Sequence, residues 1–382
     1  MKFRSAALLA LRIGLTALLL VLAVLMIDFS DKTVFLLNSG EKIESVSHRH
    51  SGSQIHVTLS DGSIRVLADH DLKSFESRLG VVAIVKGVRP WPAILVVPLL
   101  LILFSVQALR WRLLLAANGF DLSMGRAFRV VWAGTFFNQI LPGSVGGDVA
   151  KAMIVAKGEE RKAAVFGTVL LDRLVGLMTV VVIAGLAVLP VIGRPELRPV
   201  VWLIVALIVG GFAGAAIYFN PAFRKWGFAR RLKERLPFRR AIEEVDDVLK
   251  TMHHAPRTIL AGAGLSAAGQ AATIVAIFCL AQSLGATSVP LSDFFLLEPI
   301  IFLVTAVPVS VGGWGVEQVA YAKLFGMAGM AATAAVALSV LYKLSVLVVA
   351  LPGGVLFAAG ATRREAGGPV ETPAPADAGP ER

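Results

Sequence analysis

An apolar stretch of this chain is interrupted at residues 138–148, Asn-Gln-Ile-Leu-Pro-Gly-Ser-Val-Gly-Gly-Asp, and this break constrains the fold more than any other feature. Pro142 has no N–H group and clashes with the preceding helical turn, and three glycines follow it within five positions, so the segment cannot be regular helix. At membrane depth, the unpaired backbone groups of such a break are tolerated only where protein or a water-filled cavity covers them. Breaks of this kind point to the binding sites of transporters.

A second break repeats the pattern nearer the C-terminus, at residues 307–317, Val-Pro-Val-Ser-Val-Gly-Gly-Trp-Gly-Val-Glu. Pro308 again precedes a cluster of glycines within an apolar stretch. Because the two segments share one pattern, we predict a protein of two halves, each folded around one break.

The composition is that of an all-α polytopic membrane protein. The chain has 382 residues, of which 56% are hydrophobic and 16% charged, and its mean hydropathy is +0.74. The net charge of +11 comes from basic residues that flank apolar spans, as the positive-inside rule requires, so we expect no nucleic-acid partner. A single cysteine excludes a disulfide framework.

Alternating apolar and polar stretches divide the chain into six segments. We expect a first transmembrane helix at 1–30, a small extracytoplasmic β unit at 31–89, a first membrane half at 90–219 with a re-entrant hairpin near 130–156, a basic amphipathic cytoplasmic loop at 220–257, a second membrane half at 258–362 with a re-entrant hairpin near 294–326, and a disordered cytoplasmic tail at 363–382.

The β unit is predicted from one hairpin pattern. Residues 54–59 and 64–67 alternate between polar and apolar side chains, and an Asp-Gly turn separates them. Four histidines fall in this unit, but their spacing fits no known ligand pattern, so we interpret them as scattered surface residues: His48, His50, His56 and His70. We expect neither a metal nor a cofactor.

Basic residues predict an orientation in the inner (plasma) membrane, with both termini cytoplasmic. Lys2 and Arg4 precede the first span, and Arg110-Trp111-Arg112 is interpreted as an anchor at the cytoplasmic interface, where the second span ends near Leu109. With this orientation, the first broken hairpin opens from the cytoplasm and the second from outside. That is the arrangement of an inverted-topology repeat, whose binding site lies at the midplane.

Charged residues inside the apolar stretches each cost about 3 kcal/mol by insertion scales, so each needs a partner or a function. Asp148 and Lys151 are three apart and share a helix face, where they either line a cavity as a pair or leave Asp148 as the N-cap of a half-helix. The free N–H groups of such a half-helix can receive a phosphate, with Lys151 as counter-charge. Asp172 and Arg173 are adjacent and face apart, so we expect Arg173 to pair across helices with Asp148 or Glu317.

These arguments predict one substrate-binding site from both halves. Its expected members are Asn138, Gly143, Gly146, Gly147, Asp148, Lys151, Asp172, Arg173, Glu298, Gly312, Gly313, Glu317 and Lys343.

The sequence holds no Ser/His/Asp or Cys/His grouping and no P-loop, so we expect a protein that is not an enzyme. With no ATPase module in the sequence, the energy for transport is expected to come from a gradient or from the substrate.

Three motifs together resemble the lysylphosphatidylglycerol synthase transmembrane region family, whose members are also called flippase-like membrane proteins. The motifs are the first break with Asp148 and Lys151, the segment Leu171-Asp172-Arg173-Leu174, and the second break from Pro308 to Val316. The resemblance covers about 90–360. Asp172 stands where the family often has Glu, and Lys151 where Arg is common.

The resemblance implies a protein that moves a lipid with a phosphate-containing headgroup, either a phospholipid or a polyprenyl-phosphate-linked sugar, between leaflets. The soluble aminoacyl-transfer domain of the family's synthase is absent from this sequence, so synthesis is not implied. The alternative function is that of a membrane subunit or anchor in a lipid-modifying glycosyl- or aminoacyl-transferase complex, which would have a biosynthetic enzyme as partner.

Overall fold

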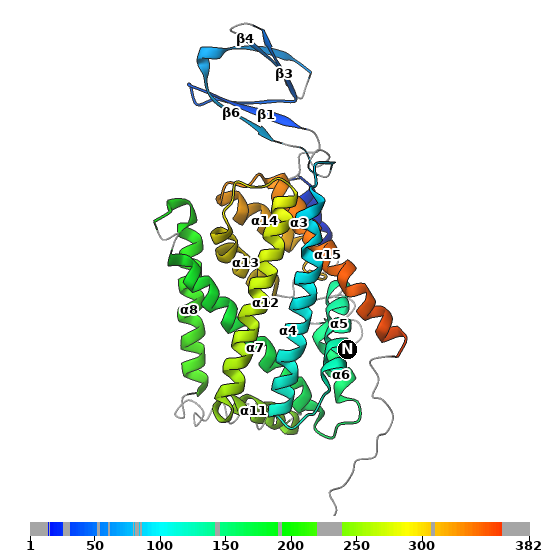
Figure 1. Cartoon of the computed structure of the whole chain (residues 1–382). Coiled ribbons are helices and arrows are strands. Elements are labelled where there is room, and N and C mark those ends of the chain that lie inside the picture. The colour runs from blue at the N-terminus through cyan, green and yellow to red at the C-terminus, as the bar shows by residue number, and fades with distance from the viewer. Residues whose placement is uncertain are drawn as a thin grey trace, which may run out of the picture.

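The computed structural model shows a helical bundle with a small β unit beyond one of its ends (Figure 1). The residues that it describes are 14, 16–25, 31–51, 54–59, 62–78, 80, 84, 86–141, 146–189, 193–219, 239–306 and 310–360. The expected tail at 363–382 and most of the first span therefore lie outside the described residues, although a short apolar helix, Thr16–Leu25, belongs to that span.

Four long helical stretches are apolar enough to cross a membrane. They are Pro90–Ala117, which comprises α3 (Pro90–Ile94) and α4 (Val96–Ala117), and the helices α7 (Lys162–Val188), α12 (Pro256–Ser283) and α15 (Ala332–Ala358). Each is about 40 Å long at 1.5 Å per residue, more than the roughly 30 Å of a bilayer core. The protein is therefore a membrane-embedded, mainly helical protein, as the composition predicts. A further apolar helix, α8 (Arg198–Phe219), ends at residue 219, where the first membrane half was predicted to end.

The second span does not end where the sequence suggested. Helix α4 continues to Ala117, eight residues beyond Leu109, and it carries Arg110 and Trp111 into the interior. Trp111 is fully buried, and its indole Nε1 donates a hydrogen bond of 3.2 Å to the hydroxyl of Thr168. The interpretation of these two residues as an interface anchor is therefore wrong, because their side chains face neighbouring helices.

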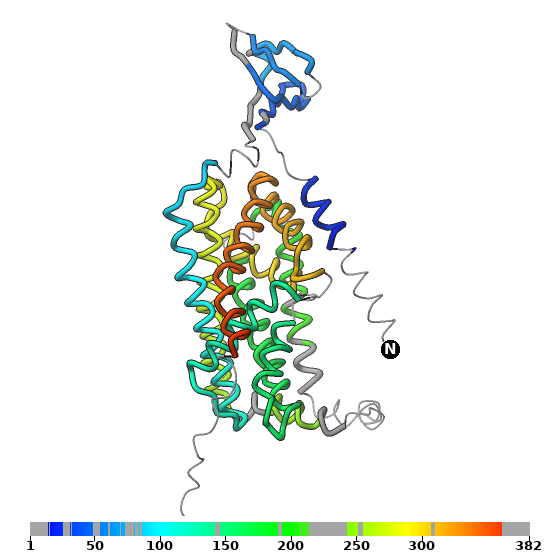
Figure 2. Tube along the Cα trace, turned by 90° about the vertical axis from the view of Figure 1, so that its right-hand side faces the viewer, coloured from blue at the N-terminus to red at the C-terminus, as the bar shows by residue number. Residues whose placement is uncertain are grey.

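Two pairs of shorter helices adjoin the breaks. Helices α5 (Met124–Ile140) and α6 (Gly146–Ala156) lie in the lower half of the bundle in Figure 1, and α13 (Leu291–Ala306) and α14 (Val316–Met327) lie in the upper half. The same separation is visible in the perpendicular view of Figure 2. Pro142 and Pro308, at the two breaks, lie outside the described residues.

The two breaks touch each other. A Cβ on Gly312 would lie 2.7 Å from the backbone carbonyl oxygen of Gln139, at the end of α5, so only glycine allows this approach. The helix Thr16–Leu25 covers the second break: the hydroxyl of Thr16 accepts a 2.9 Å hydrogen bond from the N–H of Val311. A Cβ on Gly315 would clash with the Cβ of Leu19 in the same helix. At these described positions of the second break, protein covers the irregular backbone, as a break inside a membrane requires.

Helix α15 packs closely on α5 through two glycines. A Cβ on Gly353 would meet the backbone of Trp132 at 2.6 Å, and a Cβ on Gly354 would lie 2.6 Å from the ring of Phe136. Pro352, inside α15, cannot donate to a carbonyl of the preceding turn. The indole Nε1 of Trp132 donates a hydrogen bond of 2.7 Å to the carbonyl of Val349, so a side chain of α5 binds the backbone of α15 within the turn that precedes Pro352.

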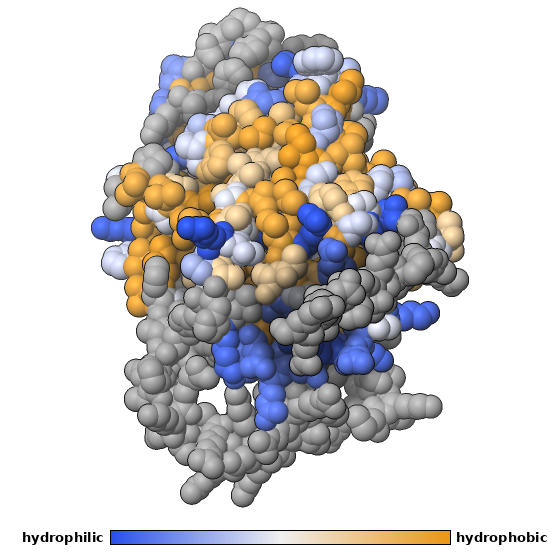
Figure 3. Space-filling view, turned by 60° about the horizontal axis from the view of Figure 1, so that its bottom comes forward, coloured by the Kyte–Doolittle hydropathy of each residue, from blue (hydrophilic) through white to orange (hydrophobic). Residues whose placement is uncertain are grey.

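Helix α11 (Arg239–His254) lies across the end of the bundle opposite to the β unit (Figure 1). It packs against α7, where a Cβ on Gly167 would be 3.2 Å from Val248, and Glu244 accepts a 3.2 Å hydrogen bond from the N–H of Ala164. At this end, hydrophilic residues replace the apolar belt of the bundle (Figure 3). The amphipathic segment expected here is thus helical from Arg239, while residues 220–238 lie outside the described residues.

The β unit consists of two three-stranded antiparallel sheets. Strands β2 (Lys42–Ser45), β1 (Lys32–Leu37) and β6 (Leu72–Arg78) form one sheet, and β3 (Ser47–Ser51), β4 (Gln54–Thr58) and β5 (Ile64–Ala68) form the other. The predicted hairpin is confirmed, because β4 pairs with β5 with Val57 opposite Arg65. The alternating residues bury a small core of Phe35, Ile43, Ile55, Val57 and Leu67.

Candidate functional site

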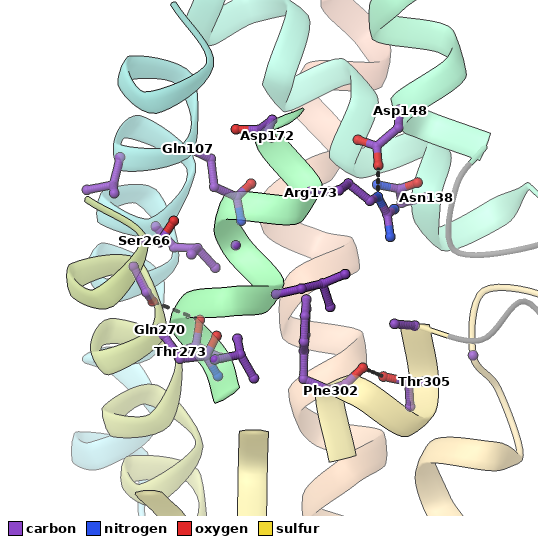
Figure 4. Close-up of a pocket in the computed structure, with 18 of the residues that line it drawn as sticks. Gln107, Asn138, Asp148, Asp172, Arg173, Ser266, Gln270, Thr273, Phe302 and Thr305 are labelled. Atoms are coloured by element: carbon purple, nitrogen blue, oxygen red, sulfur yellow. Dashed lines mark hydrogen bonds and ion pairs between the residues drawn. The ribbon is translucent and has the colours of Figure 1, made fainter. Parts of the chain in front are cut away.

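A cavity of about 330 Å³ lies among α4, α5, α6, α7, α12, α13, α14 and α15, next to both breaks (Figure 4). Seven of the described residues that line it carry charge: Arg110, Asp148, Lys151, Asp172, Arg173, Glu317 and Lys343. Polar uncharged residues also line it, among them Gln107, Asn138, Gln139, Ser266, Gln270 and Thr273.

Arg110 of α4 holds Asp172 of α7 in a two-pronged contact. The guanidinium Nε donates to Oδ1 at 2.6 Å and Nη2 donates to Oδ2 at 3.0 Å. A third donor, Nη1, reaches the hydroxyl of Ser266 on α12 at 2.6 Å. The planar fork of arginine matches a carboxylate in this geometry, so three helices are tied together at one point.

Lys151 bridges two carboxylates. Its Nζ lies 3.0 Å from Oδ1 of Asp148 and 3.4 Å from Oδ2 of Asp172, and 4.9 Å from the centre of the Trp111 ring, which adds a cation–π contact. Arg173 forms the expected cross-helix ion pair with Asp148. The five charged side chains therefore form one continuous network across α4, α6 and α7.

The alternative role of Asp148 as an N-cap is wrong. Helix α6 begins at Gly146, so Asp148 is its third residue, and the carboxylate contacts Lys151 and Arg173. The carboxylate lies instead in the first helical turn, where a negative charge is favourable, and faces the cavity.

A second ion pair comes from the other half of the chain. Lys343, near the middle of α15, donates to Oε2 of Glu317, in the first turn of α14. Trp314 places its ring centre 5.3 Å from the same ammonium group, and Gly313 lies beside it, since a Cβ there would be 3.4 Å from Nζ. Residues of the second break therefore contact a buried lysine that is 5% exposed.

The charged residues that line the cavity determine its net charge. Its described lining holds four cations and three carboxylates, which leaves one net positive charge. Arg173 is the most exposed cation of the larger network, with 26% of its side chain accessible, compared with 14% for Arg110 and 9% for Lys151. The most accessible guanidinium of the cavity is therefore that of Arg173, which is itself paired with Asp148.

Nine of the thirteen residues predicted from sequence line this one cavity: Asn138, Asp148, Lys151, Asp172, Arg173, Gly312, Gly313, Glu317 and Lys343. Gly143 lies outside the described residues. Gly146 and Gly147 shape the break instead. The N–H of Gly147 donates to Oδ1 of Asn138 at 2.8 Å, and a Cβ on Gly147 would clash with the carbonyl of Gly134.

Glu298 is also separate from the cavity lining. It is 5% exposed, and its Oε1 accepts a 3.2 Å hydrogen bond from the hydroxyl of Tyr321. Its Oε2 is buried and makes no hydrogen bond with any described residue. Glu298 is therefore not in a position to touch a ligand in the cavity in this conformation.

Sequence reasoning missed several lining residues, of which Arg110 is the most important. The apolar residues that follow Arg112, Leu-Leu-Leu-Ala-Ala, signal that the helix continues past the basic pair. Ser266, Gln270 and Thr273 are polar residues spaced three or four apart in an apolar helix, which places them on one face. That spacing was the available signal for the α12 wall of the cavity.

Comparison with known proteins gives one match. The family described as "Lysylphosphatidylglycerol synthase TM region" matches residues 67–354. The matched region includes every element that lines the cavity, apart from the last turn of α15. No curated protein and no solved structure matches the chain.

Proposed function

Because the chain belongs to the lysylphosphatidylglycerol synthase TM region family, we propose that it moves a lipid with a phosphate-containing headgroup between the leaflets of the membrane. The lipid is either a phospholipid or a polyprenyl-phosphate-linked sugar. One observation carries the proposal: charged residues from both halves of the chain converge on one cavity beside two broken helices. Ionisable groups at membrane depth are expensive, and they mark substrate pathways where they face a cavity.

The charge of the cavity supports a singly anionic headgroup. A phosphodiester carries one negative charge, and the described lining carries one net positive charge. Arg173 offers the planar donor arrangement that suits phosphate oxygens. A volume of about 330 Å³ suits a headgroup, so the acyl chains would stay in the surrounding lipid.

We further propose that the two helix pairs are re-entrant hairpins of an inverted repeat. Helices α5 and α6 lie towards one end of the bundle, and α13 and α14 towards the other, with the breaks in contact between them (Figure 1). In the orientation given by the basic residues, α11 and both termini would be cytoplasmic and the β unit extracytoplasmic, in the inner (plasma) membrane. Alternating movement of the two hairpins would then open the cavity to each face in turn.

The proposed activity is transport without covalent chemistry. Neither histidine nor cysteine lines the described cavity, and its carboxylates are paired with cations. This differs from a site that holds a free base next to a nucleophile. The family name refers to a synthase, but the proposal concerns its membrane region alone.

Reconstitution tests the proposal. Purified protein in vesicles should transfer labelled phosphatidylglycerol or a polyprenyl-phosphate sugar from one leaflet to the other, and an inactive Arg173→Ala variant should match empty vesicles. No transfer across this panel would contradict the proposal. Transfer of a sugar or aminoacyl group to lipid by the purified chain would instead favour the transferase alternative.

A further inference from the structure

Glu298 differs from the other buried carboxylates of the described bundle. Asp148, Asp172 and Glu317 each contact at least one lysine or arginine, and Asp293 accepts hydrogen bonds from Arg194 at 2.8 and 2.9 Å. Glu298 forms no ion pair with any described residue, and its single hydrogen bond comes from Tyr321.

A carboxylate in this position is far more costly when ionised than when neutral. Transfer of an unpaired charge into an apolar interior carries a large desolvation penalty even after relaxation, and a bound proton removes that penalty. The neighbours of Glu298 increase the penalty rather than reduce it, since Leu296, Leu297 and Ile300 are at most 1% exposed and belong to the apolar core. The geometry therefore requires a proton on Glu298 in this conformation.

The position of Glu298 connects it to the cavity. Phe302 and Thr305 are four and seven residues further along α13, so they lie on the same helix face, and both line the cavity (Figure 4). Glu298 thus lies one helical turn behind Phe302. Pro299 follows it directly and removes one backbone hydrogen bond from the middle of α13, which makes this turn the weakest of the helix.

The titratable groups that act on Glu298 come from two helices. Tyr321 and Glu317 belong to α14, and Tyr342 of α15 lines the cavity and lies within the electrostatic influence of Glu298. The two nearest arginines of the cavity are engaged with other carboxylates: Arg173 of α7 pairs with Asp148, and Arg110 of α4 pairs with Asp172. Helix α12 also packs on α13, and it contributes no ion pair to Glu298 within the described residues.

We propose that Glu298 is the binding site of a proton that is coupled to lipid transport; this inference rests on the proposed function. In the present conformation the carboxyl group is protonated and accepts the hydrogen bond from Tyr321. When movement of α13 displaces Phe302, water from one side of the membrane reaches the carboxyl group and takes the proton. The ionised carboxylate cannot return to its buried position until it binds a proton from water on the other side. Each cycle thus releases one proton and takes up one proton.

Infrared difference spectroscopy tests the proton site without any transport assay. At neutral pH, a band of protonated carboxylic acid should be present in the intact protein and absent from Glu298→Gln. Tyr321→Phe should retain this band and shift it, because the acid loses its hydrogen-bond partner. If neither variant alters the carbonyl region, Glu298 is ionised and the proposal is wrong. If Glu298→Gln misfolds, the band shift in Tyr321→Phe still tests the proposal.

Transport in vesicles tests the coupling. An imposed pH gradient should accelerate lipid transfer by the intact protein and produce proton flux recorded by a trapped pH dye. Glu298→Gln should lose both responses, whereas Glu196→Gln, at an exposed position in the turn before α8, should retain them. Lipid transfer that is indifferent to the gradient would overturn the coupling and leave the proposed function intact. Absence of transfer in every protein, with the infrared band present, would overturn the proposed function and the coupling, while the proton site would stand.

Discussion

Gly312 lies directly against the backbone carbonyl of Gln139, so that the two breaks, 173 positions apart in the sequence, are in contact. A Cβ on Gly312 would lie 2.7 Å from that oxygen, and its φ of +55° lies in the region that only glycine adopts readily. This contact joins the two halves of the chain beside the cavity and makes the position sensitive to a single methyl group.

Gly312→Ala should therefore destabilise the protein by more than backbone strain alone. Gly285 provides the matched control, because it has a φ of +73° and an added Cβ there would meet nothing within 4 Å. Gly285→Ala should cost about 1–2 kcal/mol of strain, whereas Gly312→Ala adds displacement of the α5 backbone. Thermal unfolding in detergent measures both. Equal shifts in Tm for the two variants would show that the contact between the breaks does not contribute to stability.

Removal of Arg110 should damage the fold more than removal of Arg173. Loss of Arg173 does not leave its partner Asp148 without a cation, because Lys151 lies 3.0 Å from the same carboxylate. Arg110→Ala removes two hydrogen bonds to Asp172 and one to Ser266, for which about 3 kcal/mol is the typical cost at a buried pair. Arg173→Ala should retain most of the stability and lose lipid transfer. Thermal unfolding and lipid transfer are measured on both variants. A larger loss of stability in Arg173→Ala than in Arg110→Ala would contradict the account.

Lys151→Ala should spare the fold and weaken the binding of anionic lipid. Each carboxylate keeps an arginine, since Asp172 retains Arg110 and Asp148 retains Arg173, while the net charge of the described lining falls from one to zero. Competition between anionic and zwitterionic lipids in the transport assay measures the change. Lys151→Arg, which keeps the charge, is the control and should retain the preference for anionic lipid.

Glu317 and Lys343 should be strongly coupled. Loss of either partner leaves a buried charge, at a typical cost of about 3–5 kcal/mol, whereas loss of both leaves none. Glu317→Gln and Lys343→Met should each lower the Tm, and the double variant should recover a large part of the loss. Additive effects in this double-mutant cycle would show that the ion pair does not exist in the membrane.

The sequence predicted the charged residues of the cavity better than its walls. Asp148, Lys151, Glu317 and Lys343 stood out because a charge in an apolar stretch is costly anywhere in a membrane. Arg110 was misread because basic residues beside tryptophan occur at interfaces, and only the packing of α4 against α7 and α12 distinguishes an interface from an interior.

Glu298 shows a different limit of sequence reasoning. The cost of a carboxylate at membrane depth was recognisable from the sequence. Which residues of α13 face the cavity, Phe302 rather than Glu298, depends on how the helix packs against its neighbours. The hairpin of β4 and β5 was predictable because alternation and an Asp-Gly turn are local signals. The contact between Gly312 and Gln139 was not, because no local pattern encodes which backbone meets a glycine.

The most direct test of the central claim is to fill the cavity during transport. The sequence contains one cysteine, so Cys279→Ala provides a background for labelling. In this background, Gln270→Cys places a thiol in the cavity wall, and Leu260→Cys places one on the surface of the same helix, at a residue that is 75% exposed. Modification of the first by a bulky thiol reagent should stop lipid transfer in vesicles, and modification of the second should leave it unchanged. Continued transfer with the cavity thiol fully modified would contradict the account.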